Sequence, residues 1–79
     1  MTDFELMGAA LEEARKAAAL GEVPVGAVVA KDGEIISAAH NTRETEKNAL
    51  HHAELLAIDA ACKKLGGWRL WQCELFVTL

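Results

Sequence analysis

The chain has 79 residues and a formal net charge of −4, with 52% hydrophobic and 25% charged residues. This length allows one small domain, and so apolar a composition excludes a disordered tail. The acidic balance gives no electrostatic reason to expect a nucleic-acid surface, and the absence of a bilayer-length apolar run or a signal peptide predicts a cytoplasmic protein without a membrane partner.

The amino-terminal segment predicts a helix. Thr2 and Glu5 match a capping box, so the helix should begin about Asp3, and Gly21 suits its end because glycine tolerates a left-handed backbone. Apolar residues recur along it at three- and four-residue steps and predict one stripe of the kind that faces a core. The members of this stripe are Phe4, Met7, Leu11, Ala14 and Ala18.

A β-hairpin is expected next. The valine-rich run 23–30 is almost continuously apolar, as in a strand that is covered on both faces. The pair Asp32-Gly33 is a two-residue hairpin signal, and a return strand follows at 35–39. Residues 41–48 are polar and charged and predict a loop.

The second half predicts a helix at 50–65 and a strand at 74–79. The helix is apolar nearly all round, which predicts burial on more than one side, and its alanines would let it lie close to a sheet. The third strand follows a helical crossover and is expected to run parallel to a neighbour. The predicted fold is therefore α/β, in the order α-β-β-α-β, with a mixed sheet.

Residues that could bind a metal or take part in catalysis lie at the head of the second predicted helix, where His52 and Glu54 flank Ala53. Upstream are Glu-Val-Pro-Val-Gly-Ala-Val-Val at 22–29 and His-Asn-Thr-Arg-Glu at 40–44. In this order and spacing the pieces resemble the zinc-dependent nucleoside deaminases, and the tRNA adenosine deaminases in particular. The resemblance covers about residues 4–79 and implies a cytidine-deaminase-like three-layer fold that is incomplete in this chain.

The resemblance assigns roles to the two polar residues of this motif. Hydrolytic deamination needs a water that is nucleophilic at neutral pH, which zinc provides, and a carboxylate that moves protons without binding the metal. By resemblance, His52 is a zinc ligand and Glu54 is the general acid/base. Spacing alone would not choose His52, because residues two apart on a helix do not face each other, whereas His51 and Glu54 are i,i+3 neighbours.

The resemblance also implies a substrate pocket. Val25 would contact the face of the base, Asn41 would hydrogen-bond the flipped nucleoside, and the backbone of Ala53 would contact the base edge. Taken by itself, Asn41 is more typical of a turn or cap residue, and Val25 is expected to belong to the core as well. The pair Trp68 and Trp71 predicts packing on the link to the third strand in preference to stacking on nucleic acid.

The zinc site is expected to be incomplete. A catalytic zinc normally has three protein ligands, and the only thiols are Cys62 and Cys73. Cys62 lies ten residues along the same predicted helix from His52, about 15 Å away, and Cys73 is expected at the far end of the sheet. In the family a Pro-Cys-x-x-Cys motif would follow Leu79, so residues 1–79 are expected to form the N-terminal part of a single deaminase domain.

Three functions are consistent with the sequence. The first is zinc-dependent deamination of adenosine to inosine at the tRNA wobble position by the intact protein, with the anticodon loop as partner and a homodimeric assembly. Residues 1–79 alone are expected to be inactive. The second keeps the fold and changes the base, as in a cytidine-, dCMP- or guanine-type deaminase. The third is a non-catalytic fragment or small binding module.

Overall fold

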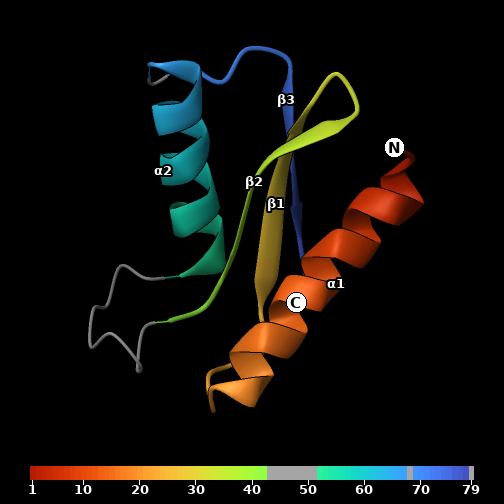
Figure 1. The fold of residues 1–79 in the computed structure, drawn as a ribbon, viewed down its shortest axis with the longest axis vertical. Coiled ribbons are helices and arrows are strands. Elements are labelled where there is room, and N and C mark those ends of the chain that lie inside the picture. Colours follow the sequence, from red (N-terminus) through yellow and green to blue (C-terminus); the bar gives the residue numbers. More distant parts are fainter. Residues whose placement is uncertain (43–51, 68, 79) are drawn as a thin grey trace.

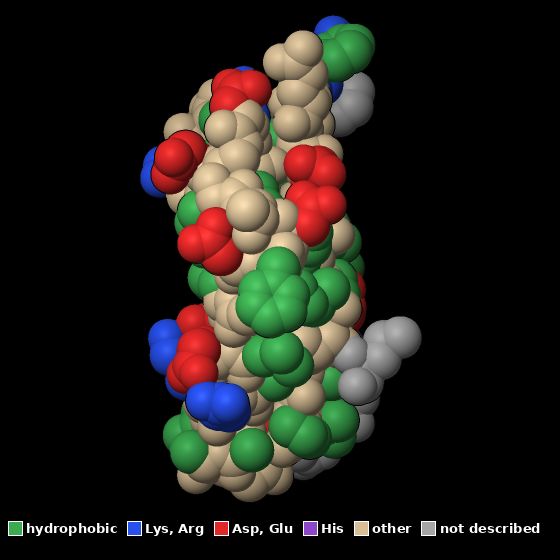
Figure 2. Space-filling model, turned by 90° about the vertical axis from the view of Figure 1, so that its right-hand side faces the viewer, with side chains coloured by type: hydrophobic (Ala, Val, Ile, Leu, Met, Phe, Trp, Pro, Cys, Tyr) green, Lys and Arg blue, Asp and Glu red, His purple; other side chains and the backbone are tan. Residues whose placement is uncertain are grey.

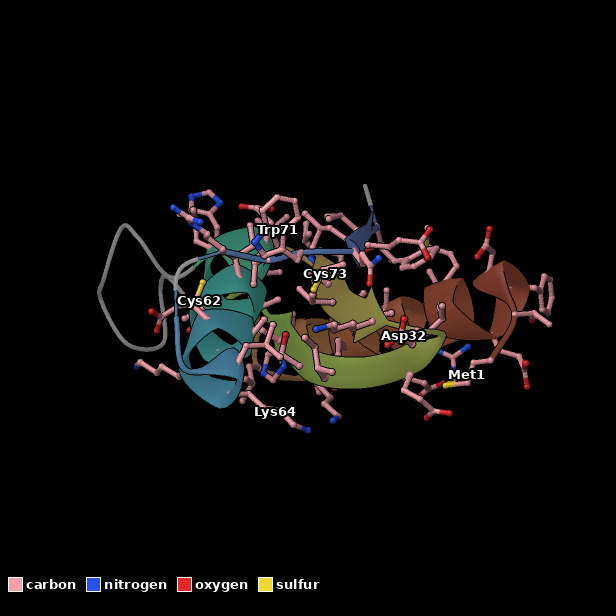
Figure 3. The ribbon with its side chains drawn as sticks, turned by 90° about the horizontal axis from the view of Figure 1, so that it is seen from above. Met1, Asp32, Cys62, Lys64, Trp71 and Cys73 are labelled. Carbon is pink, nitrogen blue, oxygen red and sulfur yellow. The ribbon has the colours of Figure 1, made fainter. Side chains whose placement is uncertain are left out.

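A computed structural model describes residues 1–42, 52–67 and 69–78 of the chain. A three-stranded sheet lies between two helices, with α1 on one face and α2 on the other (Figure 1). The view from above in Figure 3 shows the same three layers. The predicted order of elements is confirmed, and their bounds are α1 (Asp3–Ala19), β1 (Gly26–Lys31), β2 (Glu34–His40), α2 (Ala53–Leu65) and β3 (Cys73–Val77).

Both predicted ends of α1 are confirmed. The Thr2 hydroxyl accepts a hydrogen bond from the Glu5 backbone N–H at 3.1 Å, and the Glu5 carboxylate accepts one from the Thr2 N–H at 2.8 Å. This reciprocal capping satisfies two N–H groups that have no partner within the helix. After the last turn, Gly21 adopts a left-handed φ of 78°, which only glycine adopts without strain.

The predicted core-facing stripe of α1 is wrong for all its members except Ala14, which is buried. Phe4 and Leu11 are 89% and 50% exposed, and Figure 2 shows hydrophobic side chains gathered on the face of the molecule where α1 lies. The cause is the close approach of α1 to β1, since a Cβ on Gly26 would lie 2.0 Å from the Ala10 carbonyl oxygen. Mostly small residues fit such a contact, and the buried face of α1 consists of Leu6, Ala10, Glu13, Ala14 and Ala17.

The sheet has β1 in the centre, in the order β2-β1-β3. The predicted hairpin between β1 and β2 is confirmed, with Asp32 and Gly33 at positive φ values of 53° and 76°. The predicted parallel pairing of the third strand is wrong, because β3 pairs antiparallel with β1. After the crossover, β3 lies beside the central strand and not beside β2. Both outer strands therefore run opposite to β1, and the described sheet is antiparallel throughout.

The helix α2 covers the other face of the sheet through a row of alanines. Its buried residues are Ala53, Ala57 and Ala61, which pack against Ala27 and Val29 of β1. The close approach that its alanines predicted is confirmed. Burial on more than one side is wrong for the described residues: Leu55 is 46% exposed, because this single alanine row makes the close contact and the larger side chains lie beside it.

The strand directions bring several chain segments to one end of the sheet, called here the site end. The start of β1 and the ends of β2 and β3 meet there, beside the head of α2 (Figure 1). The opposite end, called the hairpin end, holds the turn at 32–33 and the start of β3. In the described ranges no helix is long and apolar enough to cross a membrane.

Candidate functional site

Asn41 forms hydrogen bonds that connect the end of β2 with the head of α2. Its backbone N–H donates to the Val25 carbonyl at 3.2 Å, and its side-chain oxygen accepts from the Ala53 N–H at 2.7 Å. His52 is the N-cap residue of α2 but its side chain makes no capping hydrogen bond. Asn41, which follows β2, therefore caps the N-terminus of α2 in place of the His52 side chain. This agrees with the cap role that is typical of an isolated asparagine. Because one lone pair of its oxygen is used in this way, the Nδ2 donor and the second lone pair of the oxygen remain for a ligand.

The structure brings His52 and Glu54 together. The distance from His52 Nδ1 to Glu54 Oε1 is 3.5 Å, and both side chains are partly exposed at 40% and 37%. This contact is possible because His52 has extended backbone angles, φ −80° and ψ 146°, and lies just before the helix. The spacing argument against His52 assumed two helical residues and does not apply to a cap residue. His51 lies outside the described residues.

The described residues fit zinc only in part. An imidazole beside a carboxylate matches one metal ligand with its neighbouring acid/base. However, the part of the chain that the structure describes contains no group of three or more His, Cys, Asp or Glu side chains that could hold a metal ion. Cys73 lies opposite Lys31 at the hairpin end, as expected, and Cys62 lies on α2 (Figure 3). Further ligands for zinc must come from outside the described residues.

The remaining predicted site residues also lie at the site end. Val25 is half-buried and packs against the core beneath α2. Ala53 is fully buried, and its N–H is bonded to Asn41. A base edge that used the Ala53 N–H would therefore have to compete with the Asn41 oxygen.

Two threonines at this end were not assigned by the sequence analysis. The Thr78 hydroxyl accepts from the Gly26 N–H at 2.9 Å, and the Thr78 N–H donates to the Gly26 carbonyl at 3.0 Å. These bonds tie the end of β3 to the start of β1. The Thr42 hydroxyl oxygen is buried and has no hydrogen-bond partner within the described ranges. A polar residue at the end of an apolar strand was the available sequence signal for Thr78.

A buried carboxylate adjoins the site end from the α1 side. Glu13 Oε1 lies 3.0 Å from His40 Nδ1, and Glu13 Oε2 accepts from Lys16 Nζ at 2.7 Å. Burial raises the pKa of Glu13, but hydrogen bonds from His40 and Lys16 outweigh this effect and hold the pKa below its usual value. The sequence analysis missed Glu13 because it placed the wrong face of α1 against the sheet.

Comparison with known proteins identifies the family to which the chain belongs. Residues 1–79 match the family model described as the cytidine and deoxycytidylate deaminase zinc-binding region. The chain belongs to this family, as its motifs predicted.

Curated relatives are similar across most of the chain. A tRNA-specific adenosine deaminase of Bacillus subtilis is 58% identical over 80 residues, which cover 100% of this chain and 50% of that protein. A protein of the same name from Aquifex aeolicus is 56% identical, over 89% of this chain and 46% of its own length. The chain thus spans about half the length of these relatives.

Solved structures confirm the cytidine-deaminase-like fold. One, from a study of A-to-I editing by tRNA:A34 deaminases at the wobble position of transfer RNA, has a TM-score of 0.91 and 40% identity, covering 95% of this chain and 54% of its own. The guanine deaminase of Bacillus subtilis has a TM-score of 0.92 and 36% identity, over 98% of this chain and 50% of its own.

Proposed function

We propose that the protein containing residues 1–79 deaminates adenosine to inosine at the wobble position of tRNA, with the anticodon loop as its macromolecular partner. The observation that carries the proposal is the 3.5 Å contact between His52 and Glu54 at the head of α2, adjacent to Asn41. The similarity to tRNA-specific adenosine deaminases over the whole chain supports the choice of substrate. We further propose a cytoplasmic homodimer.

Each site residue has a distinct role in this proposal. His52 would hold zinc together with ligands from outside the described residues, and zinc, when bound, supplies a water of lowered pKa. Glu54 takes a proton from the attacking water and delivers it to the departing ammonia, so that adenosine and water become inosine and ammonia. Asn41 donates from Nδ2 to the nucleoside, and Val25 packs against the base.

Glu54→Gln tests the acid/base role in the full-length protein. We expect deamination of an anticodon stem-loop with a wobble adenosine to fall about 10²- to 10⁴-fold, since the amide cannot shuttle the proton. Zinc content, measured by plasma mass spectrometry, should stay at the wild-type level because Glu54 is not a ligand. The matched control is Glu74→Gln on β3, an exposed glutamate outside the site, which should leave the rate unchanged.

His52→Ala separates metal binding from proton transfer. This variant should lose zinc as well as activity, whereas Glu54→Gln loses activity alone. Full zinc content in His52→Ala, or a wild-type rate in Glu54→Gln, would show that the residue roles are wrong.

A second candidate is deamination of a free base, because the likeness to the Bacillus subtilis guanine deaminase is as strong in fold as the likeness to the tRNA-editing structure. Parallel assays with guanine, cytidine, free adenosine and the RNA stem-loop distinguish these substrates. Turnover of guanine without turnover of the stem-loop would establish the second candidate. No turnover of any substrate by zinc-loaded full-length protein would favour a binding module.

A further inference from the structure

We propose that Glu13 and His40 form a positioning pair, which holds the end of β2 so that Asn41 meets the head of α2. The kinetic test of this inference rests on the proposed function. The structural argument and the hydrogen-exchange test rest only on the contacts of the described residues. His40 begins the His-Asn-Thr-Arg-Glu segment at 40–44, but neither it nor Glu13 was assigned a role by the resemblance to deaminases.

Glu13 is a charged residue on a face of α1 whose other members are apolar and mostly small. Its side chain is 12% exposed, and burial of a carboxylate is unfavourable unless both oxygens have partners. Lys16 binds one oxygen from the solvent side, with its own side chain 62% exposed. The other oxygen faces His40 across the gap between helix and strand, at 3.0 Å. The carboxylate is therefore aimed at the last residue of β2.

The strand register places His40 at a crowded point. His40 lies opposite Gly26, where α1 approaches β1 so closely that even a methyl group does not fit. Successive residues of a strand point to opposite faces of the sheet. His40 accordingly contacts α1, and Asn41 turns toward α2, where its oxygen accepts from the Ala53 N–H.

One peptide unit thus separates the contact with α1 from the contact with α2. Beyond the end of β2, the Asn41 N–H donates a hydrogen bond to the Val25 carbonyl. Loss of the His40 contact would let the strand end shift, and Asn41 would shift with it. Ligand-binding groups require placement within about 0.5 Å, so such a shift would weaken substrate binding without unfolding the protein.

A double-mutant cycle on the full-length protein tests whether His40 acts through Asn41. The variants are His40→Ala, Asn41→Ala and the double variant, and the readout is kcat/KM on the adenosine stem-loop. We expect His40→Ala to lower kcat/KM about 10-fold, and the double variant to be no slower than Asn41→Ala alone. Losses that multiply in the double variant would overturn the proposal.

The matched control is the neighbouring ion pair on the same helix. Glu12 and Arg15 have the same i,i+3 spacing as Glu13 and Lys16, but both of their side chains are exposed. We expect Glu13→Ala to lower kcat/KM as His40→Ala does, and Glu12→Ala to leave it unchanged. If Glu13→Ala and Glu12→Ala lowered kcat/KM equally, α1 would affect activity only through the general stability of the protein.

Hydrogen exchange of the Ala53 amide provides a readout that needs no activity. In the structure this amide donates to the Asn41 oxygen at 2.7 Å. We expect this bond to slow its exchange in the wild type, and His40→Ala and Asn41→Ala both to speed it. Wild-type protection in His40→Ala would overturn the positioning role, even if the variant is slow. An inactive wild-type enzyme would refute the proposed function instead, while leaving this exchange test valid.

Discussion

The two ends of the sheet are held by different kinds of contact. At the site end, hydrogen bonds of buried polar groups connect distant parts of the chain. The groups are the Asn41 oxygen, the Thr78 hydroxyl and the Glu13 carboxylate. At the hairpin end the contacts are local or exposed, such as the bond from the amino terminus to the Gly33 carbonyl. Exposed ion pairs such as Lys63–Asp59 contribute little. Within the described residues, the site end therefore combines the candidate chemistry with buried hydrogen bonds between distant segments.

Glycine substitutions should reveal this contrast most strongly. Gly26→Ala forces a Cβ against backbone atoms of α1, and we expect the free energy of unfolding to fall by about 3 kcal/mol. Gly67→Ala, beyond the end of α2, meets nothing within 4 Å and should change it by less than about 0.5 kcal/mol. Urea denaturation of both variants measures the difference, and similar losses would contradict the contrast.

Two substitutions of Asn41 should separate its cap role from its binding role. Asn41→Ala removes the buried acceptor for the Ala53 N–H and should cost about 1–2 kcal/mol of stability. Asn41→Asp keeps an acceptor, now charged, at a helix N-terminus where a negative charge is favourable. It should retain most of the stability and lose deaminase activity, because Nδ2 is gone. Full activity of Asn41→Asp would show that the donor is not used.

Acid should weaken the site end through Glu13. Its pKa in the folded protein lies below the ordinary 4.5, so the stabilisation is complete above pH 4.5 and disappears as the pH falls through the lower folded-state pKa. Glu5 shows the same direction, through backbone and side-chain hydrogen bonds with Thr2. Urea midpoints measured from neutral pH down to about pH 3 should therefore fall less steeply in Glu13→Ala than in the wild type. Identical slopes would exclude Glu13 as a contributor.

The sequence predicted which residues form the candidate site, but not the contacts between them. The motif around His52 and Glu54, together with the loop residue Asn41, led to the family, and the structure places all three beside the head of α2. The bond from the Ala53 N–H to Asn41 was not predictable, because it depends on where the end of β2 meets α2. The Glu13–His40 contact joins residues 27 apart in the chain and left no local pattern.

Local signals in the sequence determined the capping box of α1, the Asp32-Gly33 turn, the alanine row of α2 and the order of elements. Each arises from interactions among residues a few positions apart, which act in the same way wherever the segment lies. The face of α1 that is buried, the direction of β3 beside β1 and the partners of Asn41 and Glu13 were decided only by the tertiary structure. They depend on how closely whole elements approach one another, and that distance is determined at contacts such as Gly26 against Ala10, between residues far apart in the chain.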